Sequence, residues 1–488
     1  MCWGFSEKLC VLLCNKAYSM DLPASFEHTM RQLLGADYEA FREALLGEPA
    51  VSIRINRDKW SEAVPYERVP WAAEGYYLPE RPAFTFDPLL HAGSYYVQEA
   101  SSMFVEQAVK QHLGEARVAL DLCAAPGGKS TLLRSLLPDE CVLVSNEVMR
   151  PRAQVLAENI TKWGHPRCMV TSNYPADFTP LGPLFDLILV DAPCSGEGMF
   201  RKDEVAVSEW SPENVAVCWQ RQRDILTDIW PTLRPGGLLI YSTCTFNTAE
   251  DEENVRWMMD ELGATLLPIE TAPSWGITPS LVPDVAHAYR FLPGRTRGEG
   301  FFLAALRKSA DAPAEHQGDA PKAKRGKKEK AKRPTMPVPA ECKGWLMASD
   351  YTFKVQDTDV MAFPTGMEEL YATLSERLYV LKVGITLAEL KGRDAFPAHE
   401  LAMSTVLRPD AFVRCELSYA DALRYLRREA IALPSDMPRG FVIVTYRNIP
   451  LGFVKNIGNR ANNLYPQEWR IRSGHLPESE VRVLVNEN

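Results

Sequence analysis

The sequence predicts an α/β protein whose main domain is a doubly wound parallel sheet, with smaller α+β units before and after it. From about Val118 onwards, short apolar segments alternate with amphipathic helices, which is the pattern of βαβ units. The first of these segments ends in a glycine-rich turn that opens a helix, as in Rossmann-like ligand-binding domains. The chain has 488 residues, of which 46% are hydrophobic and 24% are charged. This composition is typical of globular proteins, and the length suggests about three domains.

Residues 20–86 are expected to form an N-terminal α+β unit. Helical periodicity predicts one helix over Phe26–Leu34, with Ser25 as its N-cap, and a second helix over Tyr38–Leu46. The alternating apolar residues of Val51–Asn56 then predict a half-buried strand.

The largest domain is expected to span residues 87–308. Its strands are predicted at Val118–Leu122, Val142–Ser145, Met169–Ser172, Leu187–Val190, Leu238–Tyr241 and Thr265–Ile269, with a closing strand at Gly300–Leu306. Helices are predicted between them at Lys129–Leu137, Pro151–Trp163, Val217–Leu233 and Ala249–Leu262. Such alternation gives a parallel sheet whose ligands bind at the carboxyl ends of the strands.

Charge is unevenly distributed along the chain. The 54 basic and 63 acidic residues give a net charge of −9, which by itself argues against a nucleic-acid partner. A flexible linker is expected at 309–338, and its centre, Pro321–Arg333, holds eight basic residues against one acid, Glu329. This segment carries +7 and leaves −16 for the rest of the chain. It is either a solvated tether or a basic arm that holds a polyanion without reading its sequence.

Two further units are expected after the linker: a small α+β domain at 339–400, and a second one at 401–488 with a hairpin over Gly440–Lys455. Cations, aromatic residues and asparagines then interleave, namely Lys455, Asn456, Asn459, Arg460, Asn462, Asn463, Tyr465, Trp469, Arg470 and Arg472. Rings that stack on bases, amides that bond base edges and cations that bind phosphates are the ingredients of single-stranded RNA contact. An ordinary small β domain shows the same residue types on its surface, so both interpretations stay open.

The eleven cysteines indicate a reduced, cytoplasmic protein without a metal site. They are odd in number, and none forms a C-x-x-C pair, which excludes a zinc ribbon and a thioredoxin-like motif. No apolar run reaches the roughly 18 residues of a membrane span. Residues 1–19 hold an apolar stretch shorter than the ~7–15 residues that a signal peptide needs. We interpret them as an artefactual or disordered tail before a start at Met20.

The glycine-rich turn within Asp121–Ser130 is the first candidate ligand site. A phosphate-binding P-loop would need a glycine five residues before Gly128, where the chain has Cys123, and the dinucleotide fingerprint G-x-G-x-x-G is absent. Glu147 closes the second strand 20 residues after Gly127, where a carboxylate can bond both hydroxyls of a ribose. A ribose clamp without a pyrophosphate turn fits S-adenosylmethionine better than NAD or ATP, unless Glu147 is an unrelated exposed residue.

Two cysteines follow the fourth and fifth apolar strands at corresponding places. If these strands are neighbours, Cys194 and Cys244 face the same crevice at the ligand-binding edge of the sheet. Asp191 lies three residues before Cys194, where it can orient a substrate base or handle protons. Most cysteines are inert buried residues, and we expect this of Cys141 and Cys168 but not of the pair.

A methyl-donor site beside two thiols suggests methylation of a pyrimidine at carbon 5. Carbon 5 is a poor nucleophile, but a thiolate that adds to carbon 6 converts the ring into an enamine that can take a methyl group. The proton on carbon 5 must then leave and the thiolate be expelled, which needs an acid or base nearby. One cysteine covers the attack, and a second could assist the release.

Five segments of the sequence together resemble the sequence motifs of one protein family. They are Cys123–Lys129, Asp191–Gly198 with Phe200–Asp203, Tyr241–Thr245, Gly298–Phe302 and Val454–Arg470. On these motifs the chain resembles the RNA cytosine-5 methyltransferases of the Sun (Fmu) type, and most of all the bacterial small-subunit ribosomal RNA methyltransferase F group. The resemblance covers most of the chain from about Asp21 onwards.

The resemblance implies a class I methyltransferase core, with an N-terminal unit and a PUA-like C-terminal domain that help to dock RNA. It implies that Cys244 is the nucleophile and that Cys194 aids release of the product. The implied cofactor positions are Cys123, Ala124, Ala125, Pro126, Gly127, Gly128, Lys129, Glu147 and Asp191, and Lys129 and Asp191 also serve the catalytic centre. Many relatives hold adenine with an aspartate at the end of the third strand. This chain has Asn173 there, whose carbonyl can bond the exocyclic amine, and Asp177 further on.

We therefore expect an S-adenosylmethionine-dependent methyltransferase that forms 5-methylcytosine in 16S rRNA through a covalent cysteine–cytosine intermediate. Its expected partner is ribosomal RNA or the small ribosomal subunit, with no membrane, and the chain is expected to be a monomer. The alternatives are a tRNA cytosine-5 methyltransferase and an RNA-binding ribosome assembly factor without essential catalysis. A nucleotide hydrolase that uses Lys129 and Asp191 is a third, although Cys123 in place of the required glycine argues against it.

Overall fold

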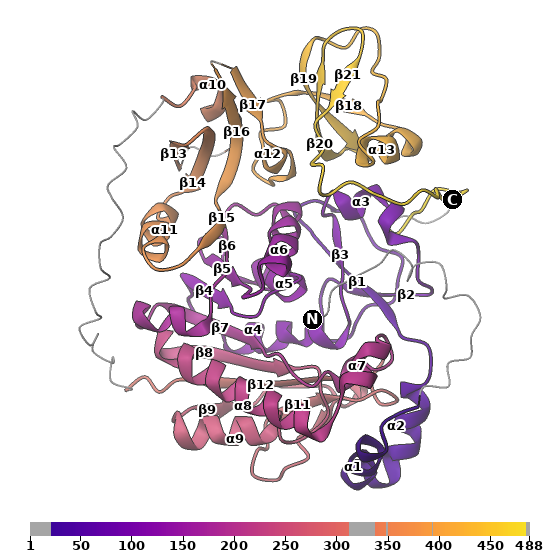
Figure 1. Ribbon diagram of the computed structural model, residues 1–488, viewed down its shortest axis with the longest axis vertical. Coiled ribbons are helices and arrows are strands. Elements are labelled where there is room, and N and C mark those ends of the chain that lie inside the picture. Colours follow the sequence, from indigo (N-terminus) through magenta and orange to yellow (C-terminus); the bar gives the residue numbers. More distant parts are fainter. Residues whose placement is uncertain (1–20, 312–336, 348–349, 393, 485–488) are drawn as a thin grey trace.

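The computed structural model describes residues 21–311, 337–347, 350–392 and 394–484 (Figure 1). The expected tail 1–19, the start at Met20 and the basic segment Pro321–Arg333 lie outside the described residues. The described parts contain four sheets.

The N-terminal unit consists of two helices and a three-stranded antiparallel sheet. Its elements are α1 (Ala24–Leu34), α2 (Tyr38–Leu45), β1 (Val51–Ile55), β2 (Gly75–Leu78) and β3 (Tyr95–Val97). The two predicted helices and the predicted strand are present, and β1 pairs with β2 on one side and with β3 on the other. Because β3 lies beyond residue 86, the sheet of this unit reaches past the boundary expected from the sequence.

The start of α1 differs from the prediction. Pro23, not Ser25, occupies the N-cap position, and no side chain caps this helix end. Ser25 lies inside the first turn, where its backbone carbonyl accepts a hydrogen bond from the Thr29 hydroxyl at 3.0 Å. The fixed φ of proline suits the entry into a helix, so the helix begins two residues earlier than serine capping suggests.

The central sheet has ten strands in the order β10-β11-β12-β8-β7-β4-β5-β6-β15, and β9 pairs with β12 off this path. The strands are β4 (Val118–Asp121), β5 (Val142–Asn146), β6 (Cys168–Thr171), β7 (Phe185–Asp191), β8 (Leu233–Thr243), β9 (Thr265–Leu267), β10 (Thr278–Pro279), β11 (Ala288–Phe291), β12 (Phe301–Arg307) and β15 (Val380–Val383). The five strands from β8 to β6 are parallel, and the strand order reverses at β4. The predicted doubly wound core is therefore confirmed.

The outer strands make this sheet mixed rather than parallel throughout. β12 runs antiparallel to β8, β11 and β10 follow it, and β15 runs antiparallel to β6 at the other edge. β15 comes from the unit after the linker, so the core sheet is completed by a segment about 200 residues distant in sequence from its partner. Local periodicity carries no information on such a pairing.

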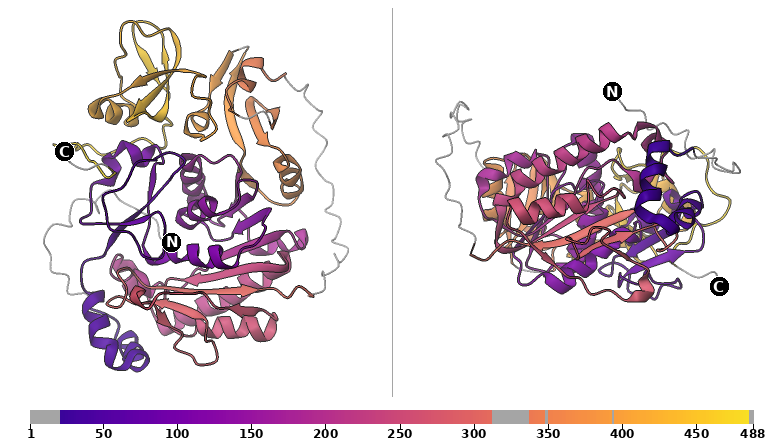
Figure 2. Two further views of the ribbon diagram at one scale, coloured as in Figure 1. Left: turned by 180° about the vertical axis from the view of Figure 1, so that it is seen from behind. Right: turned by 90° about the horizontal axis from the view of Figure 1, so that it is seen from below.

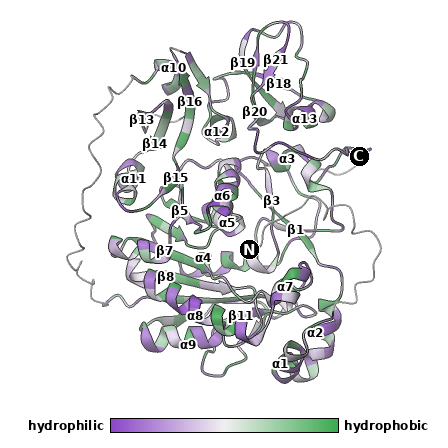
Figure 3. Ribbon diagram, viewed as in Figure 1, coloured by the Kyte–Doolittle hydropathy of each residue, from purple (hydrophilic) through white to green (hydrophobic). Residues whose placement is uncertain are grey.

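Helices cover both faces of the sheet (Figures 1 and 2). The helices are α4 (Val105–His112), α5 (Gly128–Leu136) and α6 (Arg150–Trp163) on one face, and α8 (Pro212–Ile229) and α9 (Glu252–Glu261) on the other. Leu132, Leu156 and Leu187 belong to the first apolar cluster, and Leu226 and Val255 belong to the second. Figure 3 shows the apolar character of the inner strands against the polar outer sides of α6 and α9.

Two smaller sheets follow the linker. The first has the order β13 (Tyr351–Gln356), β14 (Asp359–Pro364), β16 (Ile385–Lys391) and β17 (Asp394–Pro397), with helices α10 (Ala340–Lys343), α11 (Met367–Ser375) and α12 (His399–Met403). The second has the order β18 (Val413–Glu416), β19 (Gly440–Tyr446), β20 (Ile449–Asn456) and β21 (Ala461–Asn463), with α13 (Tyr419–Leu426). The predicted hairpin is β19–β20, whose turn residues Arg447 and Asn448 both have positive φ.

The last domain packs on the N-terminal unit. One apolar cluster joins Ile53, Trp60 and Tyr76 of the N-terminal unit to Tyr425 and Leu451 of the last domain. Figure 1 shows this contact near α3 (Pro88–His91), with the last domain in yellow. Among the helices of the described residues, none has the length and apolarity to cross a bilayer.

Arg290 on β11 makes a buried ion-pair cluster at the start of α9. Its guanidinium lies 3.0 Å from Asp251 and bonds Glu252 through two nitrogens, and all three side chains are at most 1% exposed. It also donates to the Phe246 carbonyl at 2.7 Å. The cluster thus joins an outer strand, a helix and the segment that follows β8.

Replacing Arg290 should lower the free energy of unfolding, because the two buried acids lose their cation. Arg290→Met leaves both carboxylates without their cation, so we expect the free energy of unfolding to fall by about 3–5 kcal/mol. Arg256→Met is the matched control, because Arg256 pairs with exposed Asp284 at 3.6 Å and such a pair contributes only about 0–1 kcal/mol. Urea unfolding followed by tryptophan fluorescence measures both. Equal losses in the two variants would contradict this assignment.

Candidate active site

A tight turn joins β4 to α5 and forms one wall of the site. Gly127, the N-cap residue of α5, has φ +119°, a conformation that side chains other than glycine rarely adopt. A Cβ on Gly128 would lie 3.2 Å from the Tyr96 ring. The N-terminal unit braces the turn, because Arg54 on β1 donates to the Gly128 carbonyl at 3.3 Å and to the Thr131 hydroxyl at 2.6 Å. Backbone can therefore approach a ligand closely here.

Two buried acids stand at the ends of β4 and β5. Asp121 Oδ2 accepts a hydrogen bond from the Ser130 hydroxyl at 2.6 Å, while Oδ1 is buried without a partner. Burial raises the pKa of Asp121 to about 7. Glu147 is 3% exposed, and its carboxylate accepts the Met149 N–H at 2.9 Å and lies 3.4 Å from Arg152. Glu147 is thus a buried residue whose carboxylate is fixed by the Met149 N–H and Arg152, and not an unrelated exposed residue.

These residues fit S-adenosylmethionine. The glycine turn admits a ligand close to the backbone, and the first N–H groups of α5 have no acceptor within the helix. The Glu147 carboxylate stands at the end of the second parallel strand, where doubly wound domains bond ribose hydroxyls. The unpaired Oδ1 of Asp121 supplies one more acceptor behind the turn. The segment from Cys123 to Lys129 and Glu147 are therefore the residues that would hold the cofactor.

Asn173 has partners that the sequence did not predict. Its Oδ1 accepts the backbone N–H of Tyr379 at 2.8 Å, and its Nδ2 donates to the Tyr379 carbonyl at 3.1 Å. The carbonyl that was expected to bond the adenine amine is thus engaged by the strand segment before β15. Asp177 is exposed and accepts the Tyr174 N–H at 2.9 Å, so it caps a short 3₁₀-helix.

The two cysteines lie side by side at the ends of neighbouring strands. β7 and β8 are adjacent and parallel, as the shared crevice requires. The sulfur atoms of Cys194 and Cys244 are 3.2 Å apart, and the Cys244 N–H donates to the Cys194 sulfur at 3.4 Å. The hydrogen bond with Cys244, together with burial, raises the pKa of the Cys194 thiol well above its ordinary value. Cys141 and Cys168 are fully buried, as expected of inert thiols.

An ion pair borders the two thiols. Lys129 Nζ lies 2.9 Å from Asp191 Oδ2, and Asp191 Oδ1 accepts the Ser242 hydroxyl at 2.8 Å. Burial alone would lower the pKa of Lys129, but the Asp191 carboxylate and the nearby Cys244 hold it above the ordinary value. The ammonium therefore stays charged within electrostatic range of the Cys244 sulfur. The Asp191 side chain is 31% exposed and so open to a ligand.

Glu197 was not identified from the sequence, although it lies inside the Asp191–Gly198 motif. Its carboxylate is 1% exposed and accepts five hydrogen bonds. One oxygen accepts three bonds from the segment after β8, namely the Thr245 hydroxyl at 2.7 Å and the Phe246 and Asn247 N–H groups at 2.7 and 3.0 Å. The Trp210 indole and the Asn247 amide donate to the other oxygen. The sequence did hold a sign of this role, because Glu197 stands between two glycines, Gly196 and Gly198, in a short motif.

Glu250 reinforces the same junction from the other side. Its carboxylate accepts the Ser195 N–H at 3.0 Å, the Gln222 amide at 2.7 Å and the Asn247 amide at 2.8 Å. Burial raises the pKa of Glu250 above its ordinary value. The segment that carries Cys194 is thereby bonded directly to residues beyond Cys244.

The remaining motif residues connect the site to the rest of the chain. Gly198 donates its N–H to the Cys244 carbonyl at 2.8 Å, and a Cβ on it would lie 2.6 Å from the Gly300 carbonyl. Arg201 pairs with Glu299 at 2.8 Å and donates to the Ala44 carbonyl of α2 at 2.9 Å. Glycines at 198 and 300 are thus needed for backbone contact, and Arg201 joins the site to the N-terminal unit.

The cation–aromatic segment of the last domain is partly structural. Tyr465 is 1% exposed and Asn456 is buried, with its amide bonded to the Met437 and Pro438 carbonyls. The exposed members are Asn459, Arg460, Asn462, Arg470 and Arg472. The interpretation of Tyr465 as a base-stacking residue is therefore wrong, because its ring belongs to the core.

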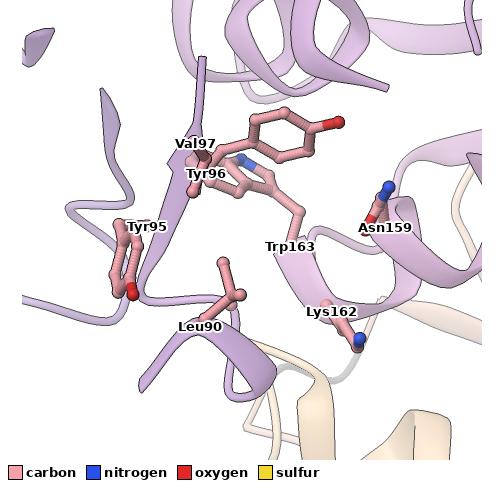
Figure 4. A pocket seen from close by; sticks show the side chains of 8 residues that line it. Leu90, Tyr95, Tyr96, Val97, Asn159, Lys162 and Trp163 are labelled. Atoms are coloured by element: carbon pink, nitrogen blue, oxygen red, sulfur yellow. The ribbon is translucent and has the colours of Figure 1, made fainter. Parts of the chain in front are cut away.

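A pocket of about 220 Å³ lies at the seam between the N-terminal unit and α6 (Figure 4). Its lining residues are Leu90, Gly93, Tyr95, Tyr96, Val97, Asn159, Lys162 and Trp163. Asn159 also donates to the Pro126 carbonyl at 2.7 Å, so the pocket adjoins the outer side of the glycine turn. None of its lining residues belongs to the thiol site.

The chain matches three family models in succession. Residues 22–100 match the N-terminal domain of 16S rRNA methyltransferase RsmF, and residues 108–307 match 16S rRNA methyltransferase RsmB/F. Residues 412–471 match the methyltransferase RsmF PUA domain. The first match extends to residue 100 and so includes β3.

Similar proteins span almost the whole chain. Ribosomal RNA small subunit methyltransferase F from Salmonella heidelberg (strain SL476) is 32% identical over 486 residues, and the protein of that name from Klebsiella pneumoniae (strain 342) is 30% identical over 481. Each match covers 94% of this chain and 98% of the relative.

Two solved structures share the fold of the core. The methyltransferase homolog protein from Pyrococcus horikoshii is 27% identical, with a TM-score of 0.52 over 59% of this chain and 96% of that chain. NSun6 from Pyrococcus horikoshii, solved with SFG, is 20% identical, with a TM-score of 0.51 over 60% of this chain and 99% of that chain.

Asp121→Asn should change how stability depends on pH. An aspartate in an unfolded chain has a pKa of about 3.9, whereas burial raises the pKa of folded Asp121 to about 7. Between these values the folded protein holds a proton that the unfolded chain has released, so this group lowers the free energy of unfolding as pH rises. The variant lacks this titration. Its stability relative to the unsubstituted protein should therefore increase between about pH 4 and 7 and then level off.

Urea unfolding at several pH values from about 5 to 8 measures this difference. Asparagine keeps the size of the side chain and an acceptor for Ser130, so the comparison isolates the charge. A stability difference that is the same at all these pH values would contradict the prediction.

Proposed function

Since the chain belongs to the ribosomal RNA small subunit methyltransferase F family, we propose that it forms 5-methylcytosine in 16S rRNA, with Cys244 as the nucleophile. As a member of this family it is an S-adenosylmethionine-dependent rRNA methyltransferase. The choice of carbon 5 and the covalent step are the proposed parts. One observation carries them: the sulfur atoms of Cys194 and Cys244 lie 3.2 Å apart beside the Lys129–Asp191 ion pair.

The pairing of the two thiols supports Cys244 as the attacking group. The pKa of Cys194 is raised, first by its hydrogen bond with Cys244 and then by burial, so Cys194 is poorly suited to attack as a thiolate. The Lys129 ammonium lies within electrostatic range of the Cys244 sulfur and stabilises negative charge that forms on it. Addition of the Cys244 thiolate to carbon 6 forms a sulfur–carbon bond and moves the ring electrons towards carbon 5 and N3.

Asp191 and Lys129 suit the handling of the cytosine ring. Asp191 is fixed on both oxygens by Lys129 and Ser242, yet its side chain remains partly exposed. A carboxylate in this place can accept a hydrogen bond from the exocyclic amine of cytosine. The adjacent Lys129 ammonium stabilises the negative charge that the ring gains during the addition.

Release requires a base, and Cys194 fits that role. S-adenosylmethionine supplies an electrophilic methyl group when it is bound. Once Cys244 is bonded to carbon 6, its hydrogen bond with Cys194 is lost, so the main cause of the raised pKa of Cys194 is removed. Cys194, which is partly exposed, can then lose its proton to solvent, and the resulting thiolate takes the proton from carbon 5. The electrons of that C–H bond restore the ring double bond and expel Cys244 as a thiolate.

The flanking domains support RNA as the substrate. The PUA domain match covers residues 412–471, and the exposed Arg460, Arg470 and Arg472 stand at its end. Cations of this kind bind phosphates without reading sequence. RNA docking by the last domain and the N-terminal unit, and action on the RNA as a monomer, belong to the proposal.

Removing each sulfur should separate the two roles. Cys194→Ala should trap a covalent RNA adduct that survives SDS electrophoresis, because attack remains and release is lost. Cys244→Ala should form no adduct, and both variants should lose methyl transfer from labelled S-adenosylmethionine. Cys342→Ala, which removes a buried thiol from the unit after the linker, is the control. An adduct formed by Cys244→Ala but not by Cys194→Ala would reverse the roles.

Bisulfite sequencing of rRNA from cells with and without this gene should locate one or more cytosines whose protection depends on the protein. Modification confined to tRNA would favour the tRNA enzyme. Absence of methyl transfer to naked rRNA and to both ribosomal subunits would favour an assembly factor without essential catalysis. Either result would contradict the proposed function.

A further inference from the structure

The segment before β15 is bonded to the carboxyl end of β6 through Tyr379. The Tyr379 carbonyl accepts the Ser172 N–H at 3.1 Å and the Asn173 amide at 3.1 Å, and its N–H donates to Asn173 Oδ1 at 2.8 Å. Asn173 is therefore held on both ends of its amide by one residue of the unit after the linker. No rotation of this side chain is possible without loss of two hydrogen bonds.

The Tyr379 ring faces the segment that follows Glu147. Its side chain is 50% exposed, and the Arg150 guanidinium lies 5.1 Å from the ring centroid. Arg150 begins α6, three residues after Glu147. The ring thus stands beside the segment between the end of β5 and α6, although it belongs to a different part of the chain.

Large apolar side chains are exposed in the two segments to which Tyr379 is joined, one through Arg150 and the other through Asn173. Val148, Met149 and Tyr174 are 39%, 43% and 69% exposed. They follow β5 and β6 directly, and the Ser172 hydroxyl lies 3.5 Å from the Val148 carbonyl. Exposed apolar side chains gathered at the ligand edge of a doubly wound sheet indicate a surface that a ligand covers.

We propose that Tyr379 completes the adenine side of the cofactor site. Its backbone positions Asn173, and its ring forms, with Val148 and Met149, the apolar surface that takes the adenine of S-adenosylmethionine. The unit after the linker is then part of the cofactor site, in addition to any role in docking RNA. This inference rests on the methyl donor of the family and does not depend on the cysteine chemistry.

The strand order favours adenine over an RNA base as the occupant. Across the sheet the order is β8, β7, β4, β5, β6 and β15. The thiols and the Lys129–Asp191 pair lie at the ends of β8, β7 and β4, whereas Glu147 and Tyr379 lie at β5 and β15. A ribose held by Glu147 directs the attached base away from the thiols, towards β6 and β15. An RNA base that stacks on Tyr379 would lie on the side remote from the reacting sulfur.

The test is the affinity of the full chain for S-adenosylhomocysteine, measured by isothermal titration calorimetry. Tyr379→Ala should weaken binding about 5- to 100-fold, the range for loss of an aromatic ring beneath a base. Tyr379→Phe should bind within about twofold of the unsubstituted protein, because the ring and the backbone remain. Met347→Ala removes an equally exposed apolar side chain, 55% exposed, from the same unit and should have no effect.

Asn173→Asp tests the positioning by the Tyr379 backbone. A carboxylate cannot donate to the Tyr379 carbonyl, so this variant should also bind S-adenosylhomocysteine several-fold more weakly. Unchanged or tighter binding would overturn the positioning role. Affinity for an rRNA fragment, measured by filter binding, should stay within about twofold for Tyr379→Ala. Loss of RNA affinity with unchanged cofactor affinity would make Tyr379 an RNA contact and overturn the proposal.

A second measurement needs no variant. Nitration of the unsubstituted protein with tetranitromethane, read by peptide mass spectrometry, should slow at Tyr379 when S-adenosylhomocysteine is present. Nitration of Tyr351, on β13 of the same unit, should not change. Equal nitration of Tyr379 with and without the ligand would overturn the proposal even if the substituted proteins fail to fold. Because this ligand has no methyl group to transfer, such a failure would leave the cytosine-5 chemistry untouched.

Discussion

The geometry of the site depends on one buried carboxylate. Glu197 lies in the segment after β7 and accepts five hydrogen bonds, four from the segment after β8 and one from Trp210. A buried charge without partners would cost several kcal/mol, so this carboxylate is stable only when both segments are in place. Since each segment carries one of the two cysteines, the same interaction fixes the distance between Cys194 and Cys244.

Backbone contacts transmit this constraint outward. The backbone of Gly198 contacts the backbone of Gly300. Arg201 donates to the Gly298 carbonyl, close to Gly300 in sequence, and to the Ala44 carbonyl of α2. The motifs that surround the cysteines are thus largely structural. Their glycines permit close backbone approach, and their charged residues pair with one another and leave the thiols and Asp191 open to a ligand.

The sequence predicts the parts of this molecule that follow from local pattern. Strands β4 to β8 and the helices between them repeat a regular alternation, and the cysteines follow strands whose adjacency the doubly wound order requires. Pairings across long sequence distances leave no such trace. β15 joins β6 from the unit after the linker, and the Asn173 amide bonds Tyr379 instead of remaining free. Tyr465 is of a residue type that often contacts RNA, but it is buried in the core. Residue type alone does not determine which side of a small sheet a ring faces.

Three additions to the doubly wound core each supply a contact at its ligand edge. Open edges of a parallel sheet must be covered, and here antiparallel strands cover both. On one side β12 begins at Phe301, whose ring lies 5.3 Å from Lys129 Nζ. On the other side β15 is preceded by Tyr379, and the N-terminal sheet sends Arg54 to the Gly128 carbonyl. A doubly wound core alone would hold the thiols, the Lys129–Asp191 pair and Glu147, but it would lack the groups that fix the glycine turn and Asn173. The added strands therefore fix side chains at the ligand edge of the core, and their loss should disturb the glycine turn and Asn173 before it disturbs the cysteine pair.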